Sequence, residues 1–102
     1  LVGTHMHLLG KSIRLSIQRQ GGGETCLEEV QKWDFNWQEG VKLAQPVRFE
    51  PGDQLSLDCV WDNTPENQPV VDGQRLPPRD VIWGEGTRDE MCLGLLYVSP
   101  AD

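Results

Sequence analysis

Three features are missing from this chain of 102 residues: a long apolar run, a cluster of basic residues and any stretch with helical period. A transmembrane helix needs about 20 apolar residues and there is no signal peptide, so we expect a soluble chain whose export signal was removed or never included. Nine basic residues are scattered among 16 acidic ones, and the net charge of -7 argues against nucleic acid and anionic membranes as partners. A chain this short forms at most one domain, whose modest core would profit from a cross-link.

Histidine is also scarce, and both histidines of the chain, His5 and His7, lie in the segment 4–10. Alternate side chains of an extended strand share a face, so the two residues would point to the same side, about 6–7 Å apart along the backbone. Two imidazoles placed in this way can converge on one metal ion. The alternative is that one ring packs in a half-buried strand and the other faces a loop. Because no initiator methionine precedes this segment, we expect the chain to be cut from a longer protein.

Alternation of polar and apolar residues predicts a strand from Lys11 to Gln18, with Ile13, Leu15 and Ile17 on its buried face. A glycine triplet at 21–23 then predicts a turn, and 25–33 the return strand of a hairpin. Such a triplet cradles phosphate only where it opens a helix, and nothing helical follows here. Further strands are expected at 47–49, 54–61, 81–83 and 90–98, with turns at 51–53 and 84–87.

Three aromatic residues, Trp33, Phe35 and Trp37, alternate with polar ones and would share one face of a strand. A stripe of this kind is more typical of a core than of a stacking platform for single-stranded nucleic acid, which would need a basic setting. We therefore expect these rings in the core.

The segment 62–80 carries four of the seven prolines and shows no sustained period. A loop of this length in a small domain is either functional or locally mobile, or it is a decoration without a role. We expect a flexible insertion here. Strands separated by turn signals, without helical segments, predict an all-β antiparallel sandwich.

Three cysteines are available for a cross-link. A bridge between Cys59 and Cys92, which both lie on expected strands, would close a loop of roughly 34 residues and stabilise the fold by about 4 kcal/mol in the chain-entropy treatment. It would imply an oxidising compartment, so a secreted or periplasmic protein. Cys26 would then be a buried free thiol or the partner of a group outside the segment, and a pairing that uses Cys26 stays open.

Four motifs span nearly the whole chain: Thr-His-Met-His-Leu-Leu-Gly-Lys (4–11), Asp-Phe-Asn-Trp-Gln-Glu (34–39), Pro-Gly-Asp-Gln-Leu (51–55) followed by Cys59, and Gly-Glu-Gly-Thr-Arg-Asp-Glu-Met-Cys (84–92). In this order they resemble the C-terminal domain of the copper type II, ascorbate-dependent monooxygenases. That family includes dopamine β-hydroxylase, the peptidylglycine α-hydroxylating enzyme and the monooxygenase-X proteins.

The resemblance implies that His5, His7 and Met91 bind the oxygen-activating copper. A thioether is a poor ligand for zinc and a good one for Cu(I), so this set suits a copper that passes through the reduced state. Three protein ligands leave a position open for dioxygen. Taken alone, Met91 would be interpreted as a core methionine.

The resemblance also pairs Cys59 with Cys92, which would fix the backbone next to Met91, whereas Cys26 matches no family cysteine. The family enzyme has a second domain that holds copper with three histidines and passes electrons from ascorbate. That domain is missing here, as are the strands that normally precede the histidine pair. We therefore expect residues 1–102 to be an incomplete C-terminal copper domain.

In the peptide-amidating branch of the family, an arginine before the histidine pair and polar side chains after Met-Cys clamp a substrate carboxylate. Gly3, Leu93 and Leu95 occupy those places here, so a peptide with a C-terminal glycine is not the expected substrate. The insertion at 62–80 departs from the animal enzymes and suggests a bacterial member.

The resemblance implies a jelly-roll-like sandwich that uses copper and dioxygen to hydroxylate an aliphatic or benzylic C–H bond of a small molecule. The electrons would come from ascorbate through the missing domain. Two other interpretations remain: a non-catalytic copper-binding or copper-storage module, and a purely structural β-sandwich.

Overall fold

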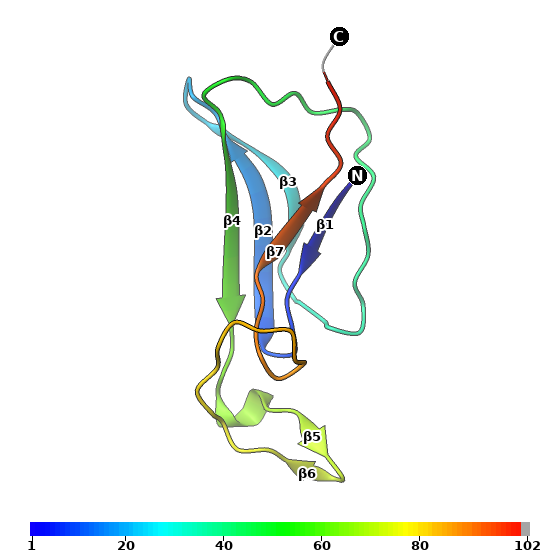
Figure 1. Cartoon of the computed structure of the whole chain (residues 1–102), viewed down its shortest axis with the longest axis vertical. Coiled ribbons are helices and arrows are strands. Elements are labelled where there is room, and N and C mark those ends of the chain that lie inside the picture. The colour runs from blue at the N-terminus through cyan, green and yellow to red at the C-terminus, as the bar shows by residue number, and fades with distance from the viewer. Residues whose placement is uncertain (101–102) are drawn as a thin grey trace.

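The computed structural model describes residues 1–100, which form two antiparallel sheets and a small separate hairpin (Figure 1). The first sheet pairs β1 (Val2–His5) with β7 (Leu93–Leu96), and the second has β2 (Gly10–Gln18) between β3 (Glu24–Val30) and β4 (Gln54–Trp61). The predicted all-β class is confirmed. Within the described residues, no helix is long and apolar enough to cross a membrane.

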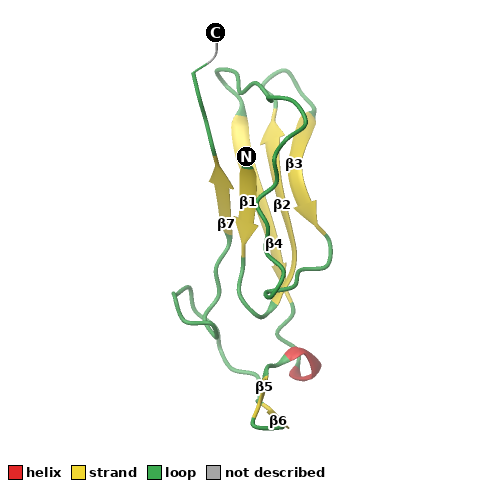
Figure 2. Ribbon diagram, turned by 90° about the vertical axis from the view of Figure 1, so that its right-hand side faces the viewer, coloured by secondary structure: helices red, strands yellow, loops and turns green. Residues whose placement is uncertain are grey.

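The strands of both sheets run along the long axis of an elongated molecule of 54 × 23 × 21 Å (Figure 2). Its core cluster takes Val2 from β1, Leu15 and Ile17 from β2 and Leu27 from β3. Full burial of an aliphatic side chain of this size is worth about 1.5–3 kcal/mol. The predicted buried face of β2 is confirmed, because Ile13, Leu15 and Ile17 are all buried.

The turn between β2 and β3 lies where the glycine triplet predicts it. Gly22 and Gly23 have φ of 99° and 83°, in the left-handed region that favours glycine. The Arg19 N–H donates to the Gly23 carbonyl at 3.0 Å and closes the hairpin. Beside this turn, N–H groups of Glu50 and Gln20 and the Arg19 guanidinium hold the pKa of Asp53 below its usual range.

The segment after β3 does not form the predicted strands. Asp34 begins a turn: its carboxylate accepts from the Asn36 N–H at 2.9 Å and its carbonyl accepts from the Trp37 N–H at 3.0 Å. An Asp turn of this kind competes with strand pairing. Trp37 is 75% exposed, so the prediction of a core strand for the three aromatic residues is wrong.

Two more predicted strands are wrong. Residues 47–49 have no strand partner, and 81–83 contribute a single bridge, from Trp83 to Glu90. The closing strand, predicted at 90–98, is limited to Leu93–Leu96. β4 has its predicted bounds and is an edge strand of its sheet, and Leu55 near its start is 51% exposed.

The insertion at 62–80 is more regular than a loop. It holds the 3-10 turn η1 (Pro65–Asn67) and a hairpin of β5 (Val70–Val71) and β6 (Gln74–Arg75), at one end of the molecule in Figure 1. Asp72 and Gly73, with φ of 51° and 78°, form its turn. An Asp-Gly pair between short apolar and polar stretches is typical of such hairpins.

A disulfide joins Cys59 of β4 to Cys92, just before β7, with Cα atoms 6.0 Å apart. This is the pair that the family resemblance implies, and it links the two sheets covalently. Cys26 has a free thiol and is exposed, so of the two alternatives the buried thiol is wrong, and a partner outside the segment stays a prediction.

We predict that the double substitution Cys59→Ala and Cys92→Ala lowers the free energy of unfolding by about 4 kcal/mol, because the unfolded chain regains the entropy of an open loop. Urea denaturation measures the change. Cys26→Ala is the control and should change stability by less than about 0.5 kcal/mol, as expected for an exposed site. A peptide map under non-reducing conditions with Cys26 in a bridge would refute the pairing.

Candidate metal centre

The two histidines lie at the end of β1, but not on one strand as predicted. β1 ends at His5, and His7 lies in the connection to β2, where the Gly10 N–H donates to the His7 carbonyl at 3.2 Å. Even so, the two rings meet edge to face with centroids 5.0 Å apart. His7 is only 5% exposed and His5 is half-buried.

The His7 ring is oriented by the chain just before Met91. Its Nδ1 lies 2.8 Å from the backbone oxygen of Asp89, which can only accept a hydrogen bond, so Nδ1 carries the proton. In a neutral imidazole the other nitrogen, Nε2, then has a free lone pair. A histidine that donates one N–H to a carbonyl and offers the other nitrogen is typical of metal sites.

His5 is oriented by Gln38 in the same way. Its Nδ1 lies 2.7 Å from Gln38 Oε1, and the Gln38 amide nitrogen donates to the Phe35 carbonyl at 2.7 Å. The second bond fixes the amide so that its oxygen faces His5, which makes Nδ1 the donor. Both rings therefore present Nε2 as the free nitrogen.

Two of the aromatic residues expected in the core pack on this site instead. The Trp33 indole N–H donates to the His7 carbonyl at 3.2 Å, and the Phe35 ring meets the His7 ring edge to face at 5.9 Å. A Cβ on Gly10 would lie 2.6 Å from Trp33 Cδ1, so glycine is needed there for the indole to approach.

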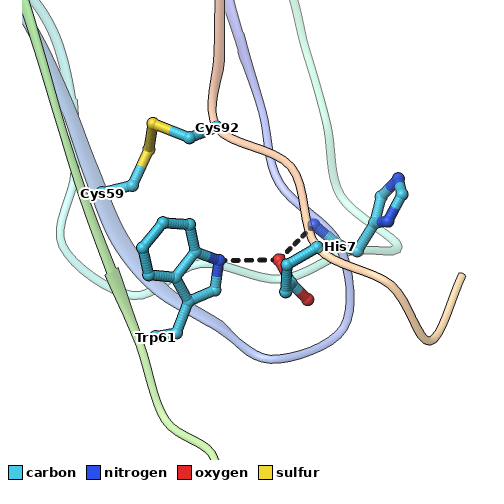
Figure 3. The surroundings of a disulfide bond; sticks show 5 residues. His7, Cys59, Trp61 and Cys92 are labelled. Carbon is cyan, nitrogen blue, oxygen red and sulfur yellow. Dashed lines mark hydrogen bonds between the residues drawn. A yellow bond between two sulfur atoms is a disulfide. The ribbon is translucent and has the colours of Figure 1, made fainter. Parts of the chain in front are cut away.

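The buried carboxylate of Glu90 contacts the backbone of His7. Glu90 is 7% exposed, and its Oε1 accepts from the His7 N–H at 3.1 Å and from the Trp61 indole N–H at 2.7 Å (Figure 3). Its Oε2 accepts from the Leu9 N–H at 3.0 Å. Glu90, Asp89 and Gln38 stand in the motifs at 34–39 and 84–92, but the sequence alone assigned them no role.

Met91 lies between two residues, Glu90 and Cys92, that long-range contacts hold in place. It is half-buried and directly follows Glu90, whose side chain bonds to His7, and it directly precedes the bridged Cys92. The hydrogen bonds from His7 to Asp89 and Glu90 thus bring the backbone of Met91 near the two histidines. Coordination by its sulfur stays a prediction.

The donor set fits a soft metal ion. An imidazole nitrogen bound at roughly 2 Å puts the ring centroid roughly 3 Å from the ion, so two rings on one ion have centroids no more than about 6 Å apart. The observed 5.0 Å is within this limit. Imidazole suits copper, and an added thioether would favour Cu(I). The described residues hold no group of three or more His, Cys, Asp or Glu placed to bind a metal.

Comparison with known proteins gives one family match. The family described as "Copper type II ascorbate-dependent monooxygenase, C-terminal domain" matches residues 1–100. "DBH-like monooxygenase protein 1" of Gallus gallus is 34% identical over 97 residues, which is 94% of this chain and 14% of that protein. "Tyramine beta-hydroxylase" of Caenorhabditis briggsae is 32% identical over 97 residues, 95% of this chain and 15% of that protein.

"Dopamine beta-hydroxylase" of Canis lupus familiaris is 26% identical over 96 residues, with 94% of this chain and 14% of that protein covered. The chain thus spans about one seventh of the length of these relatives. All three come from animals, and a bacterial source for this chain stays a prediction. No solved structure matches the chain.

We predict that both imidazoles of the metal-free protein are Nδ1–H tautomers once they are neutral, since each Nδ1 donates to an oxygen. Long-range ¹⁵N–¹H correlation spectra distinguish the two tautomers. In Gln38→Ala, His5 should become a mixture of tautomers, whereas His7, held by Asp89, should stay unchanged and serve as the internal control. Wild-type spectra with protons on both Nε2 atoms would contradict this geometry.

Proposed function

The chain belongs to the copper type II ascorbate-dependent monooxygenase family as its C-terminal domain, and from this membership we propose that it holds a catalytic copper with His5, His7 and Met91. In this role it would serve the hydroxylation of a C–H bond of a small organic substrate. The observation that carries the proposal is the pair of rings 5.0 Å apart, with both Nε2 atoms free.

Each protein donor has a distinct part. His5 and His7 would bind through Nε2, because Gln38 and Asp89 occupy the Nδ1 atoms. The Met91 thioether would favour the reduced ion. When bound, copper supplies one-electron redox chemistry and a position at which dioxygen can bind.

The surface next to His5 favours an apolar part of the substrate. Val2 and Thr4 of β1 are buried, so Gly3 and His5 lie on the opposite face of the strand. Their partners across the sheet are Leu95 and Leu93, and Leu95 is 62% exposed. Among the described residues, Gly3, Leu93 and Leu95 offer no group here that would bind a substrate carboxylate, and they suit an aliphatic or aromatic group.

The electrons would come from outside this chain. Hydroxylation consumes two electrons beyond those of the C–H bond, and one Cu(I) delivers one of them. Both histidines of the chain are assigned to a single site. We therefore propose that the full-length protein has a second copper domain, which holds its copper with three histidines and receives electrons from ascorbate. The disulfide favours a secreted or periplasmic location.

We predict that the isolated chain, loaded with copper and supplied with ascorbate and candidate amines, shows no coupled turnover. Oxygen uptake and product are measured together. Addition of a three-histidine copper domain of the family should give one product per dioxygen, and the same mixture with His5→Ala should not.

Multiple turnovers at one product per dioxygen from the chain alone would show that the second domain is dispensable. Copper binding without product in the reconstituted mixture, across aromatic and aliphatic substrates, would favour the non-catalytic copper-binding module.

A further inference from the structure

Glu90 is an acidic residue in a place that is unfavourable for a charge. Its side chain is almost fully buried, and none of the ion pairs among the described residues involves it. The free-energy cost of burying a carboxylate is several kcal/mol unless hydrogen bonds to the charged form offset it. Three N–H donors do so here, at 2.7 to 3.1 Å, and such charge-assisted bonds are stronger than neutral ones.

The three donors come from two distant parts of the chain. The His7 and Leu9 N–H groups belong to the turn between β1 and β2, and the Trp61 indole is at the end of β4. The Glu90 backbone is fixed as well: its N–H donates to the Ile82 carbonyl at 3.0 Å, and its carbonyl accepts from the Gly84 N–H at 3.3 Å. Glu90 thus contacts three segments, which are the turn between β1 and β2, the end of β4 and residues 82–84.

His7 is held at two points by consecutive residues. Glu90 holds its backbone N–H, and the Asp89 carbonyl holds its ring. Two such contacts restrict both the position and the rotation of the imidazole relative to the backbone of residues 89–90. Met91 is the next residue along the chain, so the same contacts restrict the distance between the His7 ring and the Met91 backbone.

We propose that Glu90 is a positioning residue of the copper site, which holds the His7 turn and Met91 at a fixed separation so that both reach one ion. The inference rests on the proposed function, since it takes His7 and Met91 as ligands. Trp61 donates a further hydrogen bond to the carboxylate, and the Cys59–Cys92 bridge fixes the chain directly after Met91.

The test uses Glu90→Gln, which keeps the shape of the side chain. The glutamine oxygen can replace one carboxylate oxygen, but its amide group then opposes an N–H donor and the charge is lost. Cu(I) affinity is measured by competition with a chromophoric chelator. We expect it to fall roughly 10- to 100-fold, as is usual when a group that orients a metal ligand is removed.

Amide hydrogen exchange in the metal-free protein gives a second readout. Exchange at His7 and Leu9 should accelerate in Glu90→Gln. Trp61→Phe removes the indole N–H together with part of the ring, and leaves the bonds to His7 and Leu9, so exchange at these two amides should change little. Glu85→Gln, an exposed carboxylate of the same loop, is the charge-matched control and should match the wild type in both measurements.

A core variant, Ile17→Val, separates positioning from stability, because Ile17 is buried in the core cluster and takes no part in the metal centre. Its affinity for Cu(I) should stay near that of the wild type. The proposal is overturned if Glu90→Gln binds Cu(I) as the wild type does, or if Ile17→Val loses as much affinity for the same loss of stability. Failure of the copper site itself differs from both, since wild-type protein would then bind no Cu(I), whereas failure of the catalytic role alone leaves Cu(I) binding intact and shows only as missing product.

Discussion

The site depends on the antiparallel pairing of β1 with β7. This pairing sets Val2 opposite Leu96 and His5 opposite Leu93, and so brings together residues 81 to 83 positions apart that form the hydrogen bonds around His7. Its register is set by burial, because Val2 and Thr4 face the core. A slip of one residue would turn His5 inward and reverse both faces of the strand.

Polar–apolar periodicity and turn residues correctly predicted the elements whose structure depends on residues close in sequence. The alternation at 11–18 and the glycine triplet gave β2 and its hairpin correctly, since period and turn chemistry act over a few residues. At 33–37 the same period misled, because the Asp34 turn competes with strand pairing. The rings at Trp33 and Phe35 contact His7, a partner that no local rule could identify.

The candidate metal centre was likewise predictable only in part. Spacing alone suggested that His5 and His7 could share an ion, and their rings do meet, although β1 ends between them. The roles of Gln38, Asp89 and Glu90 could not be predicted, because each acts through hydrogen bonds across a long sequence separation. Such contacts leave no period in the sequence.

The backbone is held on both sides of Met91, by the Glu90 carboxylate before it and by the Cys92 disulfide after it. The methionine side chain has three rotatable bonds, so it does not by itself fix the position of its sulfur. Fixing the backbone on both sides reduces the freedom that remains to the sulfur. If Met91 coordinates as we propose, its thioether would add the preference for Cu(I).

The most direct test of this account is X-ray absorption at the copper edge of the Cu(I)-loaded chain. We expect imidazole nitrogens and one sulfur neighbour, with the sulfur lost in Met91→Ala. The matched control is Met6→Leu, which alters the other methionine, a fully buried core residue, and should keep the sulfur. A spectrum that is the same with and without Met91 would show that Met91 is not a copper ligand.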